Sequence, residues 1–356
     1  MMTPEFWSTA RGVEATPAER ARRLEADGWF GLGHVDSECL AQDPYVALTT
    51  AALATSRLRL ATSVTNSATR HPAVAAACAA SVQMHSGGRF VLGIGRGDSA
   101  LAHLGLAPAP VKQFDHYLER LQGFLDGAEV PFDLDSDAVS GLRSSSTLGM
   151  AGGPTGARLK WIQGPKVPVD VAASGPKVIT VAAHRADAVT FALGIDRDRL
   201  KWAVALARSE RTVSPRAAQD LQMGTYVPMY VDNDRSVARQ MISGAVGSYA
   251  RFSVMHGSVA APIEEGKRRA LEKVHSAYDM NAHFTQGSPQ AQELTDDLID
   301  SFAIAGPPSY CIERLQELVE LGLTRLFVQG PGAGVPKETV QAWHFRISQE
   351  ILPAFS

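Results

Sequence analysis

A glycine-rich segment that ends on a carboxylate is the part of this sequence best suited to chemistry. Residues 90–92 form a short apolar run, after which Gly93, Gly95 and Gly97 alternate up to Asp98. The run predicts a buried strand, and glycines at its carboxyl end let another molecule approach closely. A dinucleotide fingerprint would need its third glycine at Asp98, so the spacing does not fit a Rossmann site. We expect a flat or bulky ligand here, with a plain glycine-rich turn as the alternative.

A second segment, residues 30–37, carries two titratable side chains. Alternation along a strand places Leu32, His34 and Asp36 on one face. If that face points inward, Asp36 lies at the end of the strand with His34 one layer below, and both are candidates for proton transfer. The alternatives are a hydrogen-bonded interior histidine and an aspartate that caps a short turn.

A third segment is the polar end of an apolar strand, at Ser63, Val64, Thr65 and Asn66. Small polar and β-branched residues there can present backbone N–H groups and hydroxyls to the edge of a polar ring. An ordinary strand end is the other interpretation.

A fourth segment passes from a strand directly into a helix through Ala173, Ser174, Gly175, Pro176 and Lys177. Exposed amides at the N-terminus of a helix favour an anion such as phosphate. Ser174 and Lys177 would add to such a site. Many helices begin in the same way and bind nothing.

Short β-type runs alternate with helical stretches and must position these segments. The expected strands are at residues 6–10, 29–35, 58–64, 90–93, 169–173, 188–191, 222–231 and 325–329. Alternating units of this kind demand a parallel sheet, and eight of them fit a closed (β/α)₈ barrel, an α/β fold, better than an open sheet. Functional groups then lie on the loops after the carboxyl ends of the strands.

Two long irregular excursions, at residues 131–168 and 250–300, interrupt the alternation. A plain barrel needs about 250 residues, so we interpret the excursions as insertions in one domain that spans residues 1–356. We expect their loops to overhang the mouth of the barrel and to contact a substrate. The side chains of interest there are Trp161, Arg251, His256, Tyr278 and His283. Solvated loop or dimer surface is the alternative for each of them.

Composition excludes several classes of function. The 356 residues carry a formal net charge of −3 without a basic cluster, which argues against a nucleic-acid partner. The N-terminal residues lack an apolar signal segment, so we expect a cytoplasmic protein with no membrane role. The three cysteines are far apart, which argues against a disulfide framework or a zinc site, and we expect no bound metal.

The segments, taken in order, resemble the bacterial luciferase-like superfamily of flavin- and deazaflavin-dependent oxidoreductases. The matching stretches are residues 62–74, 86–98, 168–176 and 305–315, and the resemblance covers nearly the whole chain. The glycine run that ends in an acid is most similar to the branch that uses coenzyme F-420, such as methylenetetrahydromethanopterin reductase and the deazaflavin-dependent glucose-6-phosphate dehydrogenase.

The resemblance implies a barrel that is usually a homodimer, with the ring of the coenzyme lying across the carboxyl ends of the strands. It implies a cis peptide at Ser63–Val64 against the ring, and a phosphate-bearing tail bound by residues 173–177. Asp36, Thr65, Asn66, Gly97 and Asp98 complete the expected coenzyme site. Coenzyme F-420 is the expected cofactor, with FMN as the alternative.

One position departs from the family. Several deazaflavin enzymes have an Asp-His pair where this chain has Asp36-Ser37, so the histidine proposed as a base in the sugar-phosphate dehydrogenase is absent. Asp98, Asp36 and His34 remain as candidate catalytic residues. We therefore expect a reductase that transfers hydride to a C=N or C=C bond of a small molecule. The alternatives are an FMN-dependent monooxygenase and a non-catalytic flavin-binding or deazaflavin-binding barrel.

Overall fold

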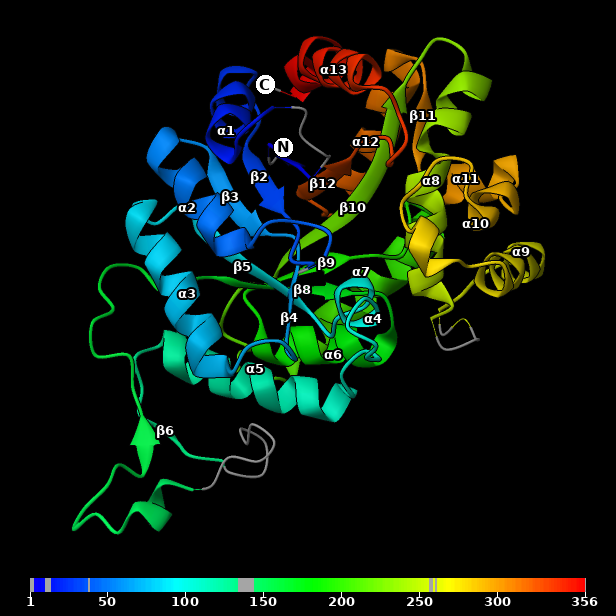
Figure 1. Ribbon diagram of the computed structural model, residues 1–356. Coiled ribbons are helices and arrows are strands. Elements are labelled where there is room, and N and C mark those ends of the chain that lie inside the picture. Colours follow the sequence, from blue (N-terminus) through cyan, green and yellow to red (C-terminus); the bar gives the residue numbers. More distant parts are fainter. Residues whose placement is uncertain are drawn as a thin grey trace.

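Eight parallel strands of the described chain close into a barrel (Figure 1). The computed structural model describes residues 3–9, 14–37, 39–133, 144–255, 259 and 261–355. The barrel strands are β1 (Glu5–Ser8), β2 (Gly31–His34), β3 (Arg59–Thr62), β5 (Phe90–Gly95), β8 (Val169–Ala173), β9 (Ala188–Phe191), β10 (Gln222–Val231) and β12 (Arg325–Gln329). Each pairs in parallel with its neighbours, and β10 pairs with both β12 and β9, which closes the ring. The predicted barrel is confirmed.

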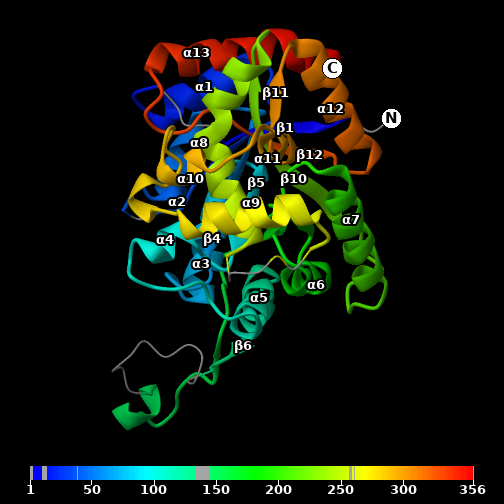
Figure 2. The ribbon, with the colours of Figure 1, turned by 90° about the vertical axis from the view of Figure 1, so that its right-hand side faces the viewer.

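Helices follow the strands and cover the outside of the barrel (Figures 1 and 2). They are α1 (Pro17–Ala26), α2 (Pro44–Ala54), α3 (Pro72–His85), α4 (Ser99–Ala102), α5 (Val111–Leu125), α6 (Pro176–Arg185), α7 (Arg197–Thr212), α8 (Arg235–Ser253), α12 (Pro308–Glu320) and α13 (Lys337–Arg346). Five of them begin with proline, whose missing N–H costs nothing in the first turn. Thr16 and Glu19 form a capping box at the start of α1.

The sequence patterns do not predict two short strands, β4 (Thr65–Asn66) and β11 (Ile304–Gly306). β4 pairs with the end of β5, and β11 pairs with the end of β10 outside the ring of eight strands. Strands of two or three residues are too short to show an alternating pattern.

Charged side chains fill the amino end of the barrel. Arg325 donates to Asp170 (2.9 Å) and to Glu5 (3.3 Å), and its side chain is 3% exposed. The ring of Trp7 stacks on Phe327 with centroids 5.3 Å apart, next to the Arg325 guanidinium. This layer blocks the amino end, so a ligand can enter the barrel only at the carboxyl ends of the strands.

The face of β2 that carries Leu32 and His34 does not point into the barrel. A Cβ atom at Gly31 would lie 2.3 Å from the Trp7 ring, and one at Gly33 would lie 2.8 Å from side chains that follow β1 and β3. Both glycines therefore face the barrel interior. A side chain at either position would collide with side chains that already fill the interior, such as the Trp7 ring. The alternation is as predicted, but it turns His34 away from the barrel axis, and Asp36, beyond the strand, meets the loop after β3.

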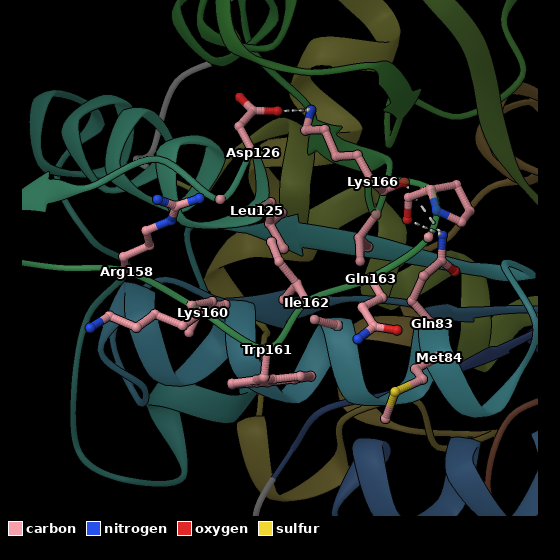
Figure 3. A pocket seen from close by; sticks show the side chains of 16 residues that line it. Gln83, Met84, Leu125, Asp126, Arg158, Lys160, Trp161, Ile162, Gln163 and Lys166 are labelled. Carbon is pink, nitrogen blue, oxygen red and sulfur yellow. Dashed lines mark hydrogen bonds and ion pairs between the residues drawn. The ribbon is translucent and has the colours of Figure 1, made fainter.

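The first insertion does not reach the mouth of the barrel. Its short strands β6 (Val130–Pro131) and β7 (Gly156–Ala157) pair antiparallel in an arm that projects from the body (Figure 1). Residues 158–167 then line a groove with the C-terminal ends of α3 and α5, where Trp161 lies beside Met84 (Figure 3). The expectation is wrong for the described part, because the chain must return to the amino end of the barrel to begin β8.

The second insertion does lie at the mouth. It consists of the end of α8, α9 (Glu265–Ser276), α10 (Pro289–Gln292) and α11 (Asp296–Phe302) (Figure 2). Phe252, Met255, His283 and Phe284 from this region line a cavity over the carboxyl ends of the strands. None of the described helices combines the length and apolar character that crossing a membrane requires.

Candidate functional site

A cavity of about 930 Å³ opens at the carboxyl ends of the barrel strands. Its wall contains every residue that the sequence predicts for catalysis or coenzyme binding. These are His34, Asp36, Ser63, Val64, Thr65, Asn66, Gly97, Asp98, Ala173, Ser174, Gly175, Pro176 and Lys177. Pockets of 300 to 1,000 Å³ are typical of small-molecule and cofactor sites. The barrel thus joins four segments that are far apart in the sequence.

The peptide between Ser63 and Val64 is cis, as expected. The glycine run packs against this turn: a Cβ atom at Gly93 would lie 2.1 Å from the Thr62 carbonyl oxygen, and one at Gly95 would lie 3.4 Å from Val64. The close approach at Gly93 is therefore made by the backbone of Thr62. The sequence pattern had indicated a ligand at this position. Gly95 also lines the cavity.

Asp36 is buried and fully engaged. Its Oδ2 accepts hydrogen bonds from Thr65 Oγ1 (2.6 Å) and from Arg70 Nη1 (2.5 Å), and its side chain is 1% exposed. Arg70 also pairs with Asp43, the cap of α2. Arg70 was not among the predicted site residues. The arrangement fixes the loop after β3 and makes Asp36 suited to hold that loop in place.

Asp98 lies at the end of the glycine run, in front of the second insertion. Burial raises the pKa of its carboxyl, and an ion pair between its Oδ2 and Arg251 Nη1 opposes that rise. Its Oδ1 is buried without a hydrogen-bond partner among the described residues. A carboxyl with one oxygen in an ion pair, one open oxygen and a pKa raised by burial is a candidate to hold and release a proton.

His34 lies at the rim of the cavity. Its Nδ1 lies 2.8 Å from the Val35 carbonyl oxygen and donates to it, and burial lowers the pKa of the ring. The imidazole is therefore neutral near pH 7. With one nitrogen bound to the backbone, His34 behaves like the hydrogen-bonded histidine that the sequence analysis kept as an alternative.

The loop before α6 supplies unpaired backbone amides. Gly175 is the N-cap residue in an extended conformation, and no side chain caps the helix. Asn66 contributes another open donor: its Oδ1 accepts from the N–H groups of Ala68 and Thr69, while its buried Nδ2 has no partner among the described residues. A cavity wall with open donors at these points suits a ligand with anionic and polar acceptor atoms.

Side chains of the second insertion complete the site, and only some were predicted. Arg251 pairs with Asp98, its guanidinium lies 4.9 Å from the centre of the Tyr278 ring, and the Tyr278 hydroxyl bonds to His283 Nδ1. His256 lies outside the described residues. Aromatic residues that were not predicted, among them Tyr249 and Phe284, also line the cavity. No motif marks these residues, since only the packing of the insertion brings them to the cavity.

Comparisons with known proteins identify the family to which this chain belongs. The model of the luciferase-like monooxygenase family matches residues 12–325. A 5,10-methylenetetrahydromethanopterin reductase of Archaeoglobus fulgidus is 27% identical over 96% of this chain and 98% of its own length. A reductase of the same name from Methanolobus tindarius is 26% identical over 83% of this chain and 84% of its own length.

Solved structures share the fold. The coenzyme F-420-dependent tetrahydromethanopterin reductase of Methanopyrus kandleri superposes with a TM-score of 0.73 at 20% identity, over all of both chains. A coenzyme F-420-dependent secondary alcohol dehydrogenase, solved with a coenzyme–acetone adduct, gives a TM-score of 0.71 at 16% identity, again over all of both chains. At these identities the structures establish the barrel and no more. Since the family model covers most of the chain, this protein is a luciferase-like oxidoreductase and belongs to the luciferase-like monooxygenase family.

Proposed function

We propose that this protein transfers a hydride between coenzyme F-420 and a small organic substrate, in the direction that reduces a C=N or C=C bond. The observation that carries the proposal is the meeting of Asp98, the Ser63–Val64 turn and the N-terminus of α6 in one cavity. The methylenetetrahydromethanopterin reductases among the relatives support the choice of a reductase. The names of both solved structures described above state dependence on coenzyme F-420.

The residues present fit such a coenzyme. The cavity is large enough for a tricyclic ring with a substrate beside it. Asn66 Nδ2 and Asp98 Oδ1 are a donor and an acceptor without partners among the described residues, as the polar edge of the ring requires. The open amides before α6, with Lys177 beside them, suit the phosphate-bearing tail.

When bound, the deazaflavin supplies or accepts the hydride. Asp98 is the group in the site that can deliver the proton that the reduced product needs, because burial raises the pKa of its carboxyl against the opposing effect of Arg251. Asp36 and Arg70 keep Thr65 and the Ser63–Val64 turn in place under the ring. Phe252, Met255 and Phe284 of the second insertion give the mouth of the cavity an apolar wall.

The cofactor assignment is tested by titrating the purified protein with coenzyme F-420 and, separately, with FMN, followed by fluorescence. We expect saturable binding of the deazaflavin and weak binding of FMN. The variant Gly175→Pro changes the loop before α6 and removes one of its N–H groups, so it should weaken binding of the coenzyme tail. Tight binding of FMN with none of coenzyme F-420 would overturn the proposal.

A further inference from the structure

The hydrogen bonds around Ser248 of α8 run in one direction. Its Oγ accepts from the Phe284 N–H (3.0 Å) and from the Tyr278 hydroxyl (3.2 Å). The serine donates in turn to the Gly244 carbonyl oxygen (3.5 Å), which can only accept. The phenol hydrogen of Tyr278 is therefore committed to Ser248. In its second hydrogen bond, to His283 Nδ1, the phenol oxygen must be the acceptor.

This direction fixes where the imidazole of His283 carries its hydrogen. Nδ1 donates to the Tyr278 oxygen, so it holds the one hydrogen of a neutral ring, and Nε2 keeps a lone pair. Burial lowers the pKa of His283 to about 4, with contributions from Arg251 and His103, so the ring is neutral at pH 7. Burial raises the pKa of Tyr278 to about 12, so the phenol keeps the hydrogen that it gives to Ser248.

The second nitrogen of His283 faces the cavity. His283 lines the cavity wall, whereas Tyr278, which holds Nδ1, is not part of the lining. Because the two nitrogens lie on different edges of the ring, the edge with Nε2 is directed into the cavity. Nε2 has no partner among the described residues and is not one of their fully buried atoms. The wall thus presents a hydrogen-bond acceptor to whatever occupies the cavity.

Backbone contacts keep this histidine in place. Phe284, the next residue, has φ of 61°, a positive value that a bulky residue adopts only where its surroundings enforce it. Its carbonyl oxygen accepts from the Ala333 N–H (2.7 Å) in the loop after β12, and a Cβ atom at Gly332 would lie 2.1 Å from that oxygen. The segment that carries His283 is therefore docked directly on the barrel.

The charges around the cavity decide what kind of donor Nε2 can accept from. The cations of the described lining are Arg20, Arg96 and Lys177. Its carboxylates, Asp36 and Asp98, are each paired with an arginine, and Arg251 acts on the His283 ring itself. These cations would repel an ammonium group, which would find no unpaired carboxylate among the described lining residues. A neutral O–H or N–H group avoids this cost, and an anionic group elsewhere on the ligand is compatible with the same cations.

We propose that His283 is a specificity-determining residue of the substrate site, and that its Nε2 accepts a hydrogen bond from a neutral O–H or N–H group of the substrate, such as a hydroxyl or an amide. The inference rests on the proposed function, because it takes the space beside the coenzyme as the substrate site. Ser248 and Tyr278 are positioning residues, since they hold the ring in the tautomer that leaves Nε2 open. A site built around an acceptor discriminates against analogues that lack the donor, because its polar group is then left unpaired.

The tautomer is measured by ¹⁵N NMR of protein labelled at histidine, without coenzyme. We expect the His283 hydrogen on Nδ1 and a neutral ring down to about pH 5. Ser248→Ala removes the acceptor of the phenol hydrogen, so Tyr278 can donate to Nδ1 and the ring hydrogen should move to Nε2. Ser243→Ala, at an exposed position of the same helix, is the matched control. A hydrogen on Nε2 in the wild type, or no change of tautomer in Ser248→Ala, would overturn the inference.

Phenol and anisole test the acceptor itself, because they share one ring and only phenol has a donor. Binding to the protein, with and without coenzyme F-420, is followed by ligand-observed NMR. We expect phenol to bind about fivefold or more tightly than anisole, as one hydrogen bond implies, and to shift the Nε2 resonance. His283→Phe should abolish this preference, while His283→Gln, whose carbonyl oxygen can accept, should keep it within about threefold. His85→Gln, on the exposed end of α3, is the matched control.

Equal binding of phenol and anisole, an unchanged preference in His283→Phe, or no binding of phenol would each contradict the role of His283. Thermal unfolding followed by circular dichroism checks that each variant is folded. If Ser248→Ala does not fold, the wild-type tautomer and the two probes still decide the question. The measurements without coenzyme test His283 alone, whereas the coenzyme titration tests the cofactor assignment, so failure of one is distinguished from failure of the other.

Discussion

At the scale of single residues, the protonation of Asp98 depends on two opposing effects. Removal from water favours the neutral carboxyl, and Arg251 favours the carboxylate. The arginine comes from an insertion 153 residues farther along the chain. The acid of the site is therefore tuned by a part of the chain that belongs to no barrel strand.

Replacing the acid tests its role directly. We expect Asp98→Asn to keep its affinity for coenzyme F-420 but to lower turnover about 10²-fold or more, because an amide cannot supply the proton. The measurement is single-turnover oxidation of the reduced deazaflavin by small molecules with a conjugated C=N or C=C bond, beside fluorescence titration of the coenzyme. Asp126→Asn, in an exposed ion pair at the amino end of the barrel, is the control. Unchanged turnover in Asp98→Asn would remove this residue from the mechanism.

Replacing the counterion should change the acid in a known direction. Arg251→Gln removes the charge that lowers the pKa of Asp98, so that pKa should rise and the carboxyl should stay protonated to a higher pH. The ¹³C NMR titration of the Asp98 side chain, assigned with Asp98→Asn, measures this shift. Arg239→Gln removes a different ion pair of the same helix and should leave the titration unchanged. A fall in the pKa of Asp98 would contradict the assignment.

At the scale of elements, the end of β5 is glycine-rich because β3 passes so close to it. Thr62 donates from its hydroxyl to the Gly93 carbonyl (2.7 Å), and its own carbonyl oxygen occupies the space of a Gly93 side chain. These contacts hold the Ser63–Val64 turn against β5. The position of the Ser63–Val64 turn, a predicted part of the coenzyme site, thus depends on backbone packing between β3 and β5.

A methyl group at this position should disrupt the contact. We expect Gly93→Ala to destabilise the protein by about 2 to 3 kcal/mol or more, because backbone atoms must move to admit the Cβ. Urea unfolding followed by circular dichroism measures the loss. Gly152→Ala is the matched control, since nothing lies within 4 Å of a Cβ there. Equal stability of the two variants would show that the close approach is absent.

At the scale of the whole molecule, the two ends of the barrel have different tasks. Arg325, Asp170 and Glu5 close the amino end with buried charges, while the carboxyl end is left open for the cavity. The second insertion covers that cavity, and the first lies at the opposite end and beside the barrel (Figure 2). Stability and ligand binding are therefore separated along the barrel axis.

The buried ion cluster gives a prediction for the fold. Arg325→Met leaves Asp170 buried without its cation, and we expect a loss of about 3 to 5 kcal/mol of stability. Arg268→Met breaks an exposed pair with Glu265 and should cost about 1 kcal/mol or less. Chemical denaturation of both variants provides the comparison. A small effect of Arg325→Met would mean that the cluster is not needed to close the barrel.

Local sequence patterns predict much of this architecture. Apolar runs that alternate with helical stretches place all eight barrel strands within a few residues. The inward face of β2 was not predictable, because it depends on the Trp7 ring of a neighbouring strand. The path of the first insertion was also missed, since an irregular segment carries no periodic signal that shows which end of a barrel it covers.

By itself, the sequence determined the barrel, the order of its strands and the four segments that meet at the carboxyl ends, because parallel strands in β-α units can close in few ways. Only the tertiary structure decided which partners those segments find. Docking of the second insertion brings His283 to the cavity wall and Arg251 to Asp98, and the backbone at Gly93 packs against Thr62. Contacts between distant parts of a chain follow from packing in three dimensions, which periodicity along the sequence does not record.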